Sequence, residues 1–236
     1  MALLCSRKAP GLSELLAGGT SWRLVSVVTS DPQCQELSRL HAVGVPTLIH
    51  DIRAFYAARN ARLGDLQHRP DYDRQTAELL APFRPDLVVC CGYLHILTEP
   101  LLTAYPQRVI NVHDSDLPKY QGLRATRDAV LAGERETRST VHLVTAGVDV
   151  GPPLVRSWPF PVLPFVIDVK GYAYAHRDWM MTTAWGPLLV RAIERFARDE
   201  VRFLGGRAVV AGALGPEELA SPTAAAWGGR RVSGGE

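Results

Sequence analysis

Residues 87–91 read Leu-Val-Val-Cys-Cys, and residues 109–112 read Val-Ile-Asn-Val. A short, uninterrupted apolar run such as the first is typical of a strand buried on both faces, as strands of parallel sheets are. On either side of these runs, further short apolar runs alternate with helical patterns. This alternation predicts an α/β fold, with a Rossmann-like, mostly parallel central sheet and helices on both faces.

Hydrophobic spacing and turn residues set the predicted elements. The predicted strands cover residues 2–6, 24–29, 45–49, 87–91, 109–112, 140–144 and 154–158. The predicted helices cover residues 12–17, 33–42, 71–82, 125–132 and 171–197, and the last should bend or restart at Gly186-Pro187. Strands at 201–204 and 207–210 flank Gly205-Gly206, which is a two-residue hairpin signal.

These elements predict one folded domain over residues 1–211. From residue 212 onward the chain is rich in alanine, glycine, proline and serine. That composition predicts a mobile, low-complexity tail over 212–236, with a short helix near residues 216–220.

The composition is that of an ordinary globular protein, with 47% hydrophobic and 21% charged residues among 236. The formal net charge of +2 provides no global field that would recruit nucleic acid or an anionic membrane. No apolar run approaches the roughly 18 residues of a membrane span, and the first apolar stretch is too short for a signal peptide. The four cysteines show no CxxC spacing. We therefore expect a reduced, cytoplasmic protein that binds neither nucleic acid nor membranes.

Polar side chains stand at the end of one predicted strand and in the loop after another. Asn111 and His113 alternate in phase, so both point the same way from the strand at 109–112. A histidine suits proton transfer near neutral pH, and an asparagine amide can donate to a developing oxyanion. Asp149 lies in a glycine-rich loop after the strand at 140–144, where it could orient His113 and stabilise its charged form.

Two longer stretches carry a family resemblance. The stretch CGYLHILTEPLLTAYPQRVINVHDSDLPKYQGL (91–123), followed by ERETRSTVHLVTAGVDVGPPL (134–154), resembles the formyltransferases that use 10-formyltetrahydrofolate. The similarity is strongest to those that act on glycinamide ribonucleotide. It is dense over residues 85–162 and thinner over 24–51. The family's Asn-x-His pair and its D-x-G-P loop both occur here in order, which assigns Asn111, His113 and Asp149 as the catalytic set.

The resemblance implies the formyltransferase fold and a mechanism. A primary amine attacks the formyl carbon of 10-formyltetrahydrofolate, giving a tetrahedral intermediate; Asn111 binds the oxyanion, and His113, held by Asp149, takes part in proton transfer. The folate should lie along Tyr93, Leu94, His95, Ile96 and Leu97 and along Val144, Thr145 and Gly147 of the second loop. The resemblance further implies a small-molecule amine as acceptor, no metal ion, and a monomer or homodimer.

Three departures from the family all affect the acceptor side. The loop that cradles a substrate phosphate in relatives is replaced by Ser-Arg-Lys-Ala-Pro-Gly (6–11), in which Arg7 and Lys8 form either an anion site or a solvated basic turn. The glutamate that holds the substrate in relatives is replaced by one of residues 181–183, Met-Thr-Thr. Asp114 and Asp116 stand where relatives have proline and leucine, and could bind a cationic amine.

Three functions therefore remain open. The chain formylates glycinamide ribonucleotide, or it formylates another amine such as an amino sugar or a specialised metabolite, or it is a folate-binding paralogue without activity. The intact catalytic set argues against the last of these. A nicotinamide-dependent oxidoreductase is disfavoured, because no GxGxxG follows any predicted strand.

Overall fold

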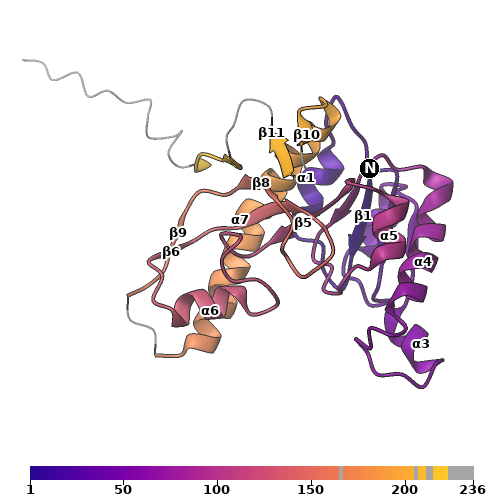
Figure 1. Ribbon diagram of the computed structural model, residues 1–236, viewed down its shortest axis with the longest axis horizontal. Coiled ribbons are helices and arrows are strands. Elements are labelled where there is room, and N and C mark those ends of the chain that lie inside the picture. Colours follow the sequence, from indigo (N-terminus) through magenta and orange to yellow (C-terminus); the bar gives the residue numbers. More distant parts are fainter. Residues whose placement is uncertain (165–166, 205–206, 211–214, 223–236) are drawn as a thin grey trace, which may run out of the picture.

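The computed structural model describes residues 1–164, 167–204, 207–210 and 215–222. Within these residues a sheet of eight strands has the order β12-β8-β7-β5-β4-β1-β2-β3 (Figure 1). Its strands are β1 (Ala2–Cys5), β2 (Ser26–Thr29), β3 (Thr47–Ile49), β4 (Val88–Cys90), β5 (Val109–His113), β7 (Thr140–Leu143), β8 (Pro153–Arg156) and β12 (Glu217–Glu218). All neighbours pair in parallel except β5 with β7 and β7 with β8. The predicted mostly parallel α/β sheet is confirmed.

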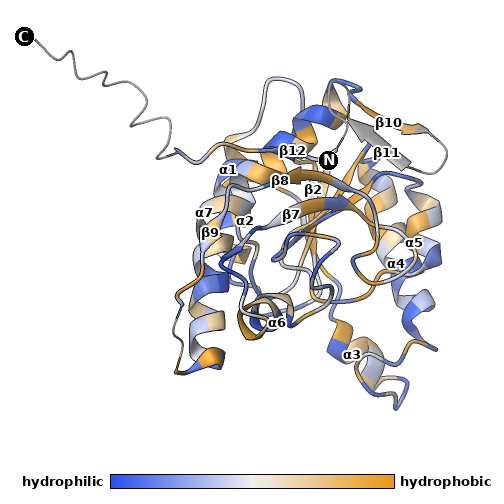
Figure 2. Cartoon of the chain, turned by 60° about the vertical axis from the view of Figure 1, so that its left-hand side comes forward, coloured by the Kyte–Doolittle hydropathy of each residue, from blue (hydrophilic) through white to orange (hydrophobic). Residues whose placement is uncertain are grey.

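Helices cover both faces of the sheet (Figure 2). On one side lie α1 (Leu12–Ala17) and α7 (Val169–Ala197), and on the other lie α4 (Arg69–Leu80) and α5 (Glu99–Ala104). Successive strand residues point to opposite sides. Cys91 therefore packs in the core beside α7, and its neighbour Cys90 packs in the core that includes Leu80 and Leu101.

Several helices differ from the prediction at their ends. The helix predicted over residues 33–42 begins later, as α2 (Leu37–Ala42). In contrast, α6 (Ala125–Leu131) lies where a helix was predicted. Two short helices, α5 and α3 (Ile52–Ala57), were not predicted. The start of α3 has a visible cause, because the Asp51 carboxylate accepts from the backbone N–H groups of Arg53 and Ala54. The remaining elements are a 3₁₀ turn at Ala81–Phe83 and the short pair β6 (Glu136–Thr137) and β9 (Phe160–Pro161).

We predicted that the longest helix, α7, would bend or restart at Gly186-Pro187. The helix continues through Pro187 and does not restart there, and a bend at this point stays a prediction. A Cβ atom on Gly11 would lie 2.8 Å from Gly186 Cα, so the start of α1 packs directly on the α7 backbone here. Although α7 has 29 residues, none of the helices in the described part of the chain is long and apolar enough to span a membrane.

At the C-terminal end, β10 (Val201–Leu204) and β11 (Arg207–Val210) pair antiparallel, as predicted. The turn residues 205–206 between them lie outside the described residues. The helix predicted near 216–220 is wrong, because Glu217 and Glu218 form β12 at the edge of the sheet. Arg191 and Arg195 of α7 each approach the Glu217 carboxylate to 2.8 Å and hold this edge strand in place. The last part of the predicted tail, residues 223–236, also lies outside the described residues.

Candidate active site

Strand β5 presents Asn111 and His113 on one face of the sheet. Ile110 and Val112 point into the core beside α7, so the alternating residues Asn111 and His113 point to the opposite side. His113 is the last residue of β5, at the C-terminal edge of the parallel strands, and is only 7% exposed.

Strand β7 adds a second histidine to this pair. The antiparallel register places His142 directly opposite Asn111, and His142 Nε2 lies 3.1 Å from the Asn111 side-chain nitrogen. The other ring nitrogen, Nδ1, lies 3.0 Å from the Leu143 carbonyl oxygen, which can only accept. A neutral His142 with its proton on Nδ1 therefore accepts a hydrogen bond from Asn111, which fixes the orientation of that amide.

His142 was not predicted as a site residue. The signal was present, since Thr140 and His142 alternate with Val141 and Leu143 in the predicted strand. What the sequence did not show was that this strand pairs antiparallel with β5.

The loop that carries Asp149 folds back over the sheet. Because β7 runs antiparallel to β5, it ends beside Ile110 rather than beside His113. The loop returns sharply: a Cβ atom on Gly151 would lie 1.7 Å from the Leu143 carbonyl oxygen, so glycine is required there. Asp149 itself has φ 53°, in the left-handed region that aspartate tolerates better than most residues.

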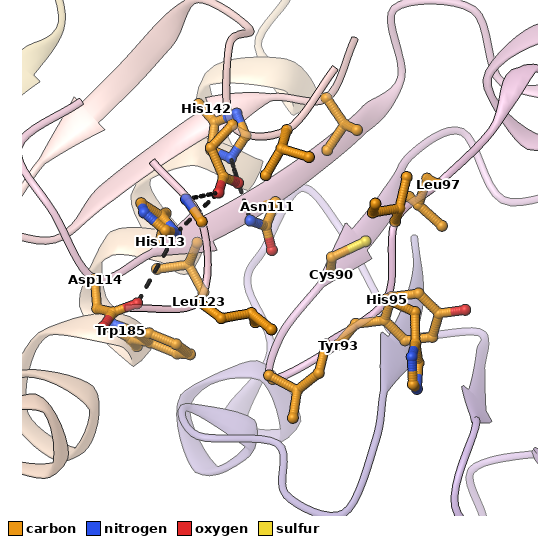
Figure 3. Close-up of a pocket in the computed structure, with 18 of the residues that line it drawn as sticks. Cys90, Tyr93, His95, Leu97, Asn111, His113, Asp114, Leu123, His142 and Trp185 are labelled. Carbon is orange, nitrogen blue, oxygen red and sulfur yellow. Dashed lines mark hydrogen bonds and ion pairs between the residues drawn. The ribbon is translucent and has the colours of Figure 1, made fainter. Parts of the chain in front are cut away.

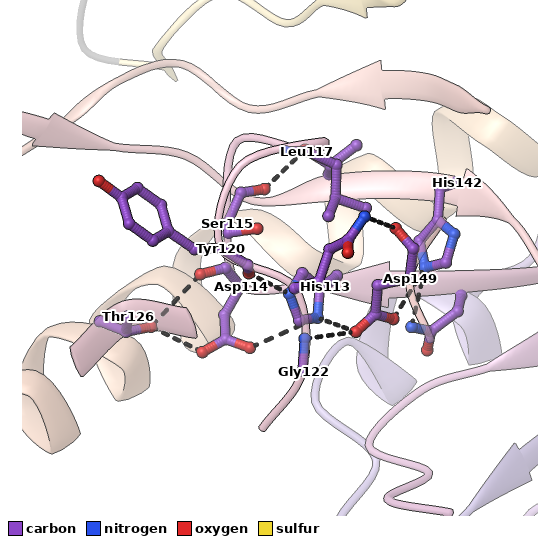
Figure 4. Close-up of polar contacts among 12 residues, drawn as sticks. His113, Asp114, Ser115, Leu117, Tyr120, Gly122, Thr126, His142 and Asp149 are labelled. Atoms are coloured by element: carbon purple, nitrogen blue, oxygen red, sulfur yellow. Dashed lines mark hydrogen bonds and ion pairs between the residues drawn. The ribbon is translucent and has the colours of Figure 1, made fainter. Parts of the chain in front are cut away.

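The fold-back brings the Asp149 carboxylate to both histidines. Oδ2 lies 3.5 Å from His113 Nδ1 and accepts from the Gly122 N–H at 2.9 Å, while Oδ1 lies 3.4 Å from His142 Nε2 (Figure 4). Burial by itself would raise the pKa of Asp149. The interaction with the His142 ring, the charge of His113 and the Gly122 N–H outweigh burial and lower this pKa, so Asp149 is a carboxylate at neutral pH.

Acceptors surround the ring of His113. Its Nε2 lies 3.0 Å from the Tyr120 carbonyl oxygen, and its Nδ1 faces Asp149 and, at 3.9 Å, Asp114 Oδ1. A neutral imidazole has one N–H, whereas the cation has two and can donate on both sides. These surroundings suit a side chain that takes up a proton during a reaction.

A cavity of about 340 Å³ opens beside these groups (Figure 3). Asn111, His113 and His142 lie on one side of it, and Tyr93, His95 and Leu97 lie on the other. Of the residues predicted to bind folate, Tyr93, Leu94, His95, Ile96, Leu97, Val144 and Gly147 line this cavity, and Thr145 does not. Leu94 is 52% and Ile96 44% exposed. The cavity therefore offers apolar surface beside a cluster of polar groups, as is typical of a site for a small organic ligand.

A buried polar network supports the far wall. Arg69 donates to the Tyr93 hydroxyl at 2.9 Å and pairs with Asp73 at 3.1 Å. Asp73 in turn accepts from the backbone N–H and the hydroxyl of Thr98. Burial, together with the charges of Arg69 and Arg53, lowers the pKa of His95 to about 4. His95 is thus neutral at physiological pH and provides no charge for a ligand.

The structure separates the residues predicted for the acceptor. Asp114 lines the cavity, but it is 4% exposed and already accepts from Thr126 Oγ1 at 2.6 Å and from Arg177 Nε at 2.9 Å. Asp116 pairs with Arg156 at 3.0 Å and does not line the cavity.

The loop after β1 also lies apart from the cavity. Both Arg7 and Lys8 are exposed, neither lines the cavity, and Arg7 donates to the Gln33 side chain at 2.8 Å. Of the four residues predicted to bind the acceptor, the structure thus brings only Asp114 to the cavity beside Asn111, His113 and Asp149.

Comparisons with known proteins show which family this chain is similar to. A family model described as formyl transferase matches residues 6–167. The phosphoribosylglycinamide formyltransferase of Mycobacterium tuberculosis is 35% identical over 209 residues, which are 86% of this chain and 92% of that protein. The trifunctional purine biosynthetic protein adenosine-3 of Drosophila melanogaster is 31% identical over 170 residues, or 70% of this chain, and the chain spans 12% of that much longer protein.

Among solved structures, glycinamide ribonucleotide transformylase 1 from Symbiobacterium toebii has a TM-score of 0.72 and 30% identity. The match covers 89% of this chain and 92% of that one. Sequence and fold thus agree over most of the chain, including the strands that carry Asn111, His113 and the loop of Asp149. On these grounds the chain belongs to the formyl transferase family.

Proposed function

We propose that this protein transfers the formyl group of 10-formyltetrahydrofolate to a primary amine, in the manner of a phosphoribosylglycinamide formyltransferase. The observation that carries the proposal is the convergence of Asn111, His113 and Asp149 on one wall of a cavity whose other wall is largely apolar. A folate ring is flat and largely apolar on its faces, so Leu97 and Val144 would pack against it.

The donor supplies an electrophilic formyl carbonyl when it is bound. Asn111 has two amide hydrogens, and one of them is directed to His142. The other can donate to the formyl oxygen as negative charge develops there. As the bond from the amine nitrogen to the formyl carbon forms, the bond from that carbon to the folate nitrogen breaks. His113 would take up the proton that the amine loses and return it to the departing folate nitrogen, and the Asp149 carboxylate would stabilise the cationic form of His113.

The test is a formyl-transfer assay on the purified protein. It is given 10-formyltetrahydrofolate and a panel of primary amines that includes glycinamide ribonucleotide and amino sugars. We expect amine-dependent loss of the formyl group from the donor, slowed about a hundredfold or more in His113→Ala. Binding of a folate analogue without transfer to any amine would favour the non-catalytic alternative.

A second candidate acceptor is supported by a specific observation. Arg7 and Lys8 do not line the cavity, and Thr182 and Thr183, in the region where relatives have a glutamate, are occupied by hydrogen bonds within α7. Both features favour an amine other than glycinamide ribonucleotide. A specificity constant for glycinamide ribonucleotide of about 10⁴ per molar per second or above would exclude this alternative.

A further inference from the structure

A second hollow adjoins the active-site cavity. It has a volume of about 490 Å³ and lies between the first turns of α6 and α7. Asp114, Leu123 and Arg177 line both the cavity and the hollow. A ligand that reaches His113 through the cavity can therefore extend past Leu123, which is 78% exposed, into the hollow.

The hollow is basic. Its lining includes four cationic side chains, Arg124, Arg127, Lys170 and Arg177, and two carboxylates, Asp114 and Asp168, a net charge of +2. Both carboxylates already have partners in the protein. Asp114 pairs with Arg177 and accepts from Thr126, and Asp168 accepts from the Gly171 N–H at 3.0 Å at the start of α7.

The remaining cations of the hollow are largely unpaired. Arg127 forms one exposed contact with Asp128 at 3.6 Å. Arg124 and Lys170 have no ion-pair partner among residues 1–164, 167–204, 207–210 and 215–222. Two unpaired cations and a third in a weak surface pair thus line one hollow beside the active site, a setting that favours an anion.

The basic loop after β1 does not provide positive charge beside the cavity. The exposed side chains of Arg7 and Lys8 lie on the loop after β1 and do not line the cavity, as described above. The cations that adjoin the catalytic groups are those of α6 and α7.

We propose that this basic hollow binds the carboxylate or phosphate group of the acceptor, so that the substrate is a primary amine that carries an anionic group. The identification of the ligand as a formyl acceptor rests on the proposed function. The existence of the anion site does not depend on it. Arg124 and Lys170 contact the anion, and Leu123 packs against the part of the acceptor that connects the anion to the amine.

The first arm of the test needs no enzymatic activity. Inorganic phosphate and acetate are titrated separately, at constant ionic strength, into three proteins: the wild type, the double variant Arg124→Ala/Lys170→Ala, and the control Arg62→Ala. The control removes an exposed arginine from the segment after α3. Anion binding is measured by backbone amide NMR shifts and by the melting temperature. We expect saturable binding of at least one anion to the wild type and the control, weakened about tenfold or more in the double variant. The preferred anion identifies phosphate or carboxylate as the ligand group. Equal binding by all three proteins, or no saturable binding by the wild type, overturns the proposal.

The second arm uses matched acceptors that differ by one anionic group: glycinamide ribonucleotide against its ribonucleoside, and glucosamine 6-phosphate against glucosamine. For any pair that reacts, the anionic member should have the lower KM in the wild type. In the double variant, the KM of the anionic member should rise about tenfold or more, while the KM of the neutral member changes less than about twofold. Equal effects on both members of a reacting pair overturn the proposal. If no amine is formylated, the proposed function fails and the first arm still decides on the anion site.

Discussion

Replacing Asp149 by asparagine removes a charge from the active site while keeping the shape of the side chain. Its oxygens lie 3.5 Å from His113 Nδ1 and 3.4 Å from His142 Nε2, and the side chain is 14% exposed. At 3.5 Å, a carboxylate and an imidazolium attract each other by about 5 kcal/mol at an effective dielectric constant of about 20. The asparagine oxygen can still accept from the Gly122 N–H, which keeps the side chain beside His113. Part of the attraction to His113 therefore survives. We therefore expect a loss of about 3 to 4 kcal/mol of transition-state stabilisation, which lowers kcat about 100- to 1,000-fold.

Steady-state kinetics at neutral pH measures this loss. Asp71→Asn is the matched control, because it removes a surface carboxylate that pairs with Arg74 on α4. Circular dichroism should be unchanged in both variants. If kcat of Asp149→Asn stays within about tenfold of the wild type, the assigned role of the carboxylate is wrong.

Stability gives an independent readout of the same substitution. The pKa of Asp149 is lower in the folded chain than its unfolded value of about 3.8, because the contacts with His142, His113 and Gly122 outweigh burial. A carboxylate with a lowered pKa stabilises the fold above its unfolded pKa, and this contribution is lost as the pH falls through the folded pKa. Acidification through this range should therefore destabilise the wild type more than Asp149→Asn, as measured by denaturant unfolding. Parallel curves for the two proteins would contradict the lowered pKa.

Three further outcomes are expected. His113→Ala should lower kcat about a hundredfold or more with an unchanged circular dichroism spectrum, and a loss of less than about tenfold would remove His113 from proton transfer. Leu97→Ala removes apolar surface from the cavity wall, so the donor KM should rise about tenfold with kcat within about threefold; an unchanged donor KM would place the folate elsewhere. Glu217→Gln weakens the contacts with Arg191 and Arg195 and should lower the melting temperature by about 2–4 °C at neutral pH. Burial would raise the pKa of Glu217, but the two arginines outweigh burial and lower it. The difference in melting temperature between the wild type and Glu217→Gln should therefore vanish as the pH falls through this pKa. A difference in melting temperature that does not depend on pH would contradict this account.

The sequence was sufficient where a local pattern determines the structure. The apolar run at 87–91 fixes a strand buried on both faces, and alternation in β5 places Asn111 and His113 on one face whatever lies beside them. The cavity residues Tyr93 to Leu97 were also predicted, but from the family resemblance and not from their spacing.

The features that the sequence did not predict depend on contacts between distant segments. His142 joins the site because β7 pairs antiparallel with β5, and strand direction is not visible in a strand's own residues. Glu217 and Glu218 have poor intrinsic strand preference. They form β12 because they pair in parallel with β8 and because two arginines of α7 form ion pairs with Glu217. Asp114 was predicted as a residue that could bind a cationic amine, and Arg177, 63 residues away in the chain, pairs with it.

The Asn111–His142 pair links the chemistry to the way the sheet assembles. A slip of β7 by one residue would turn His142 into the apolar core beside α7 and bring out Val141 or Leu143 in its place. His142 is 2% exposed in the native register, but there it has Asn111 and Asp149 as polar partners. A slip would place the imidazole among apolar side chains without these partners, so the alternation that selects the register during folding also selects the hydrogen-bond partner of Asn111. Under the proposed function, a misregistered chain would be compact and inactive. Formyl transfer would then report on correct strand alignment as well as on the presence of Asn111, His113 and Asp149.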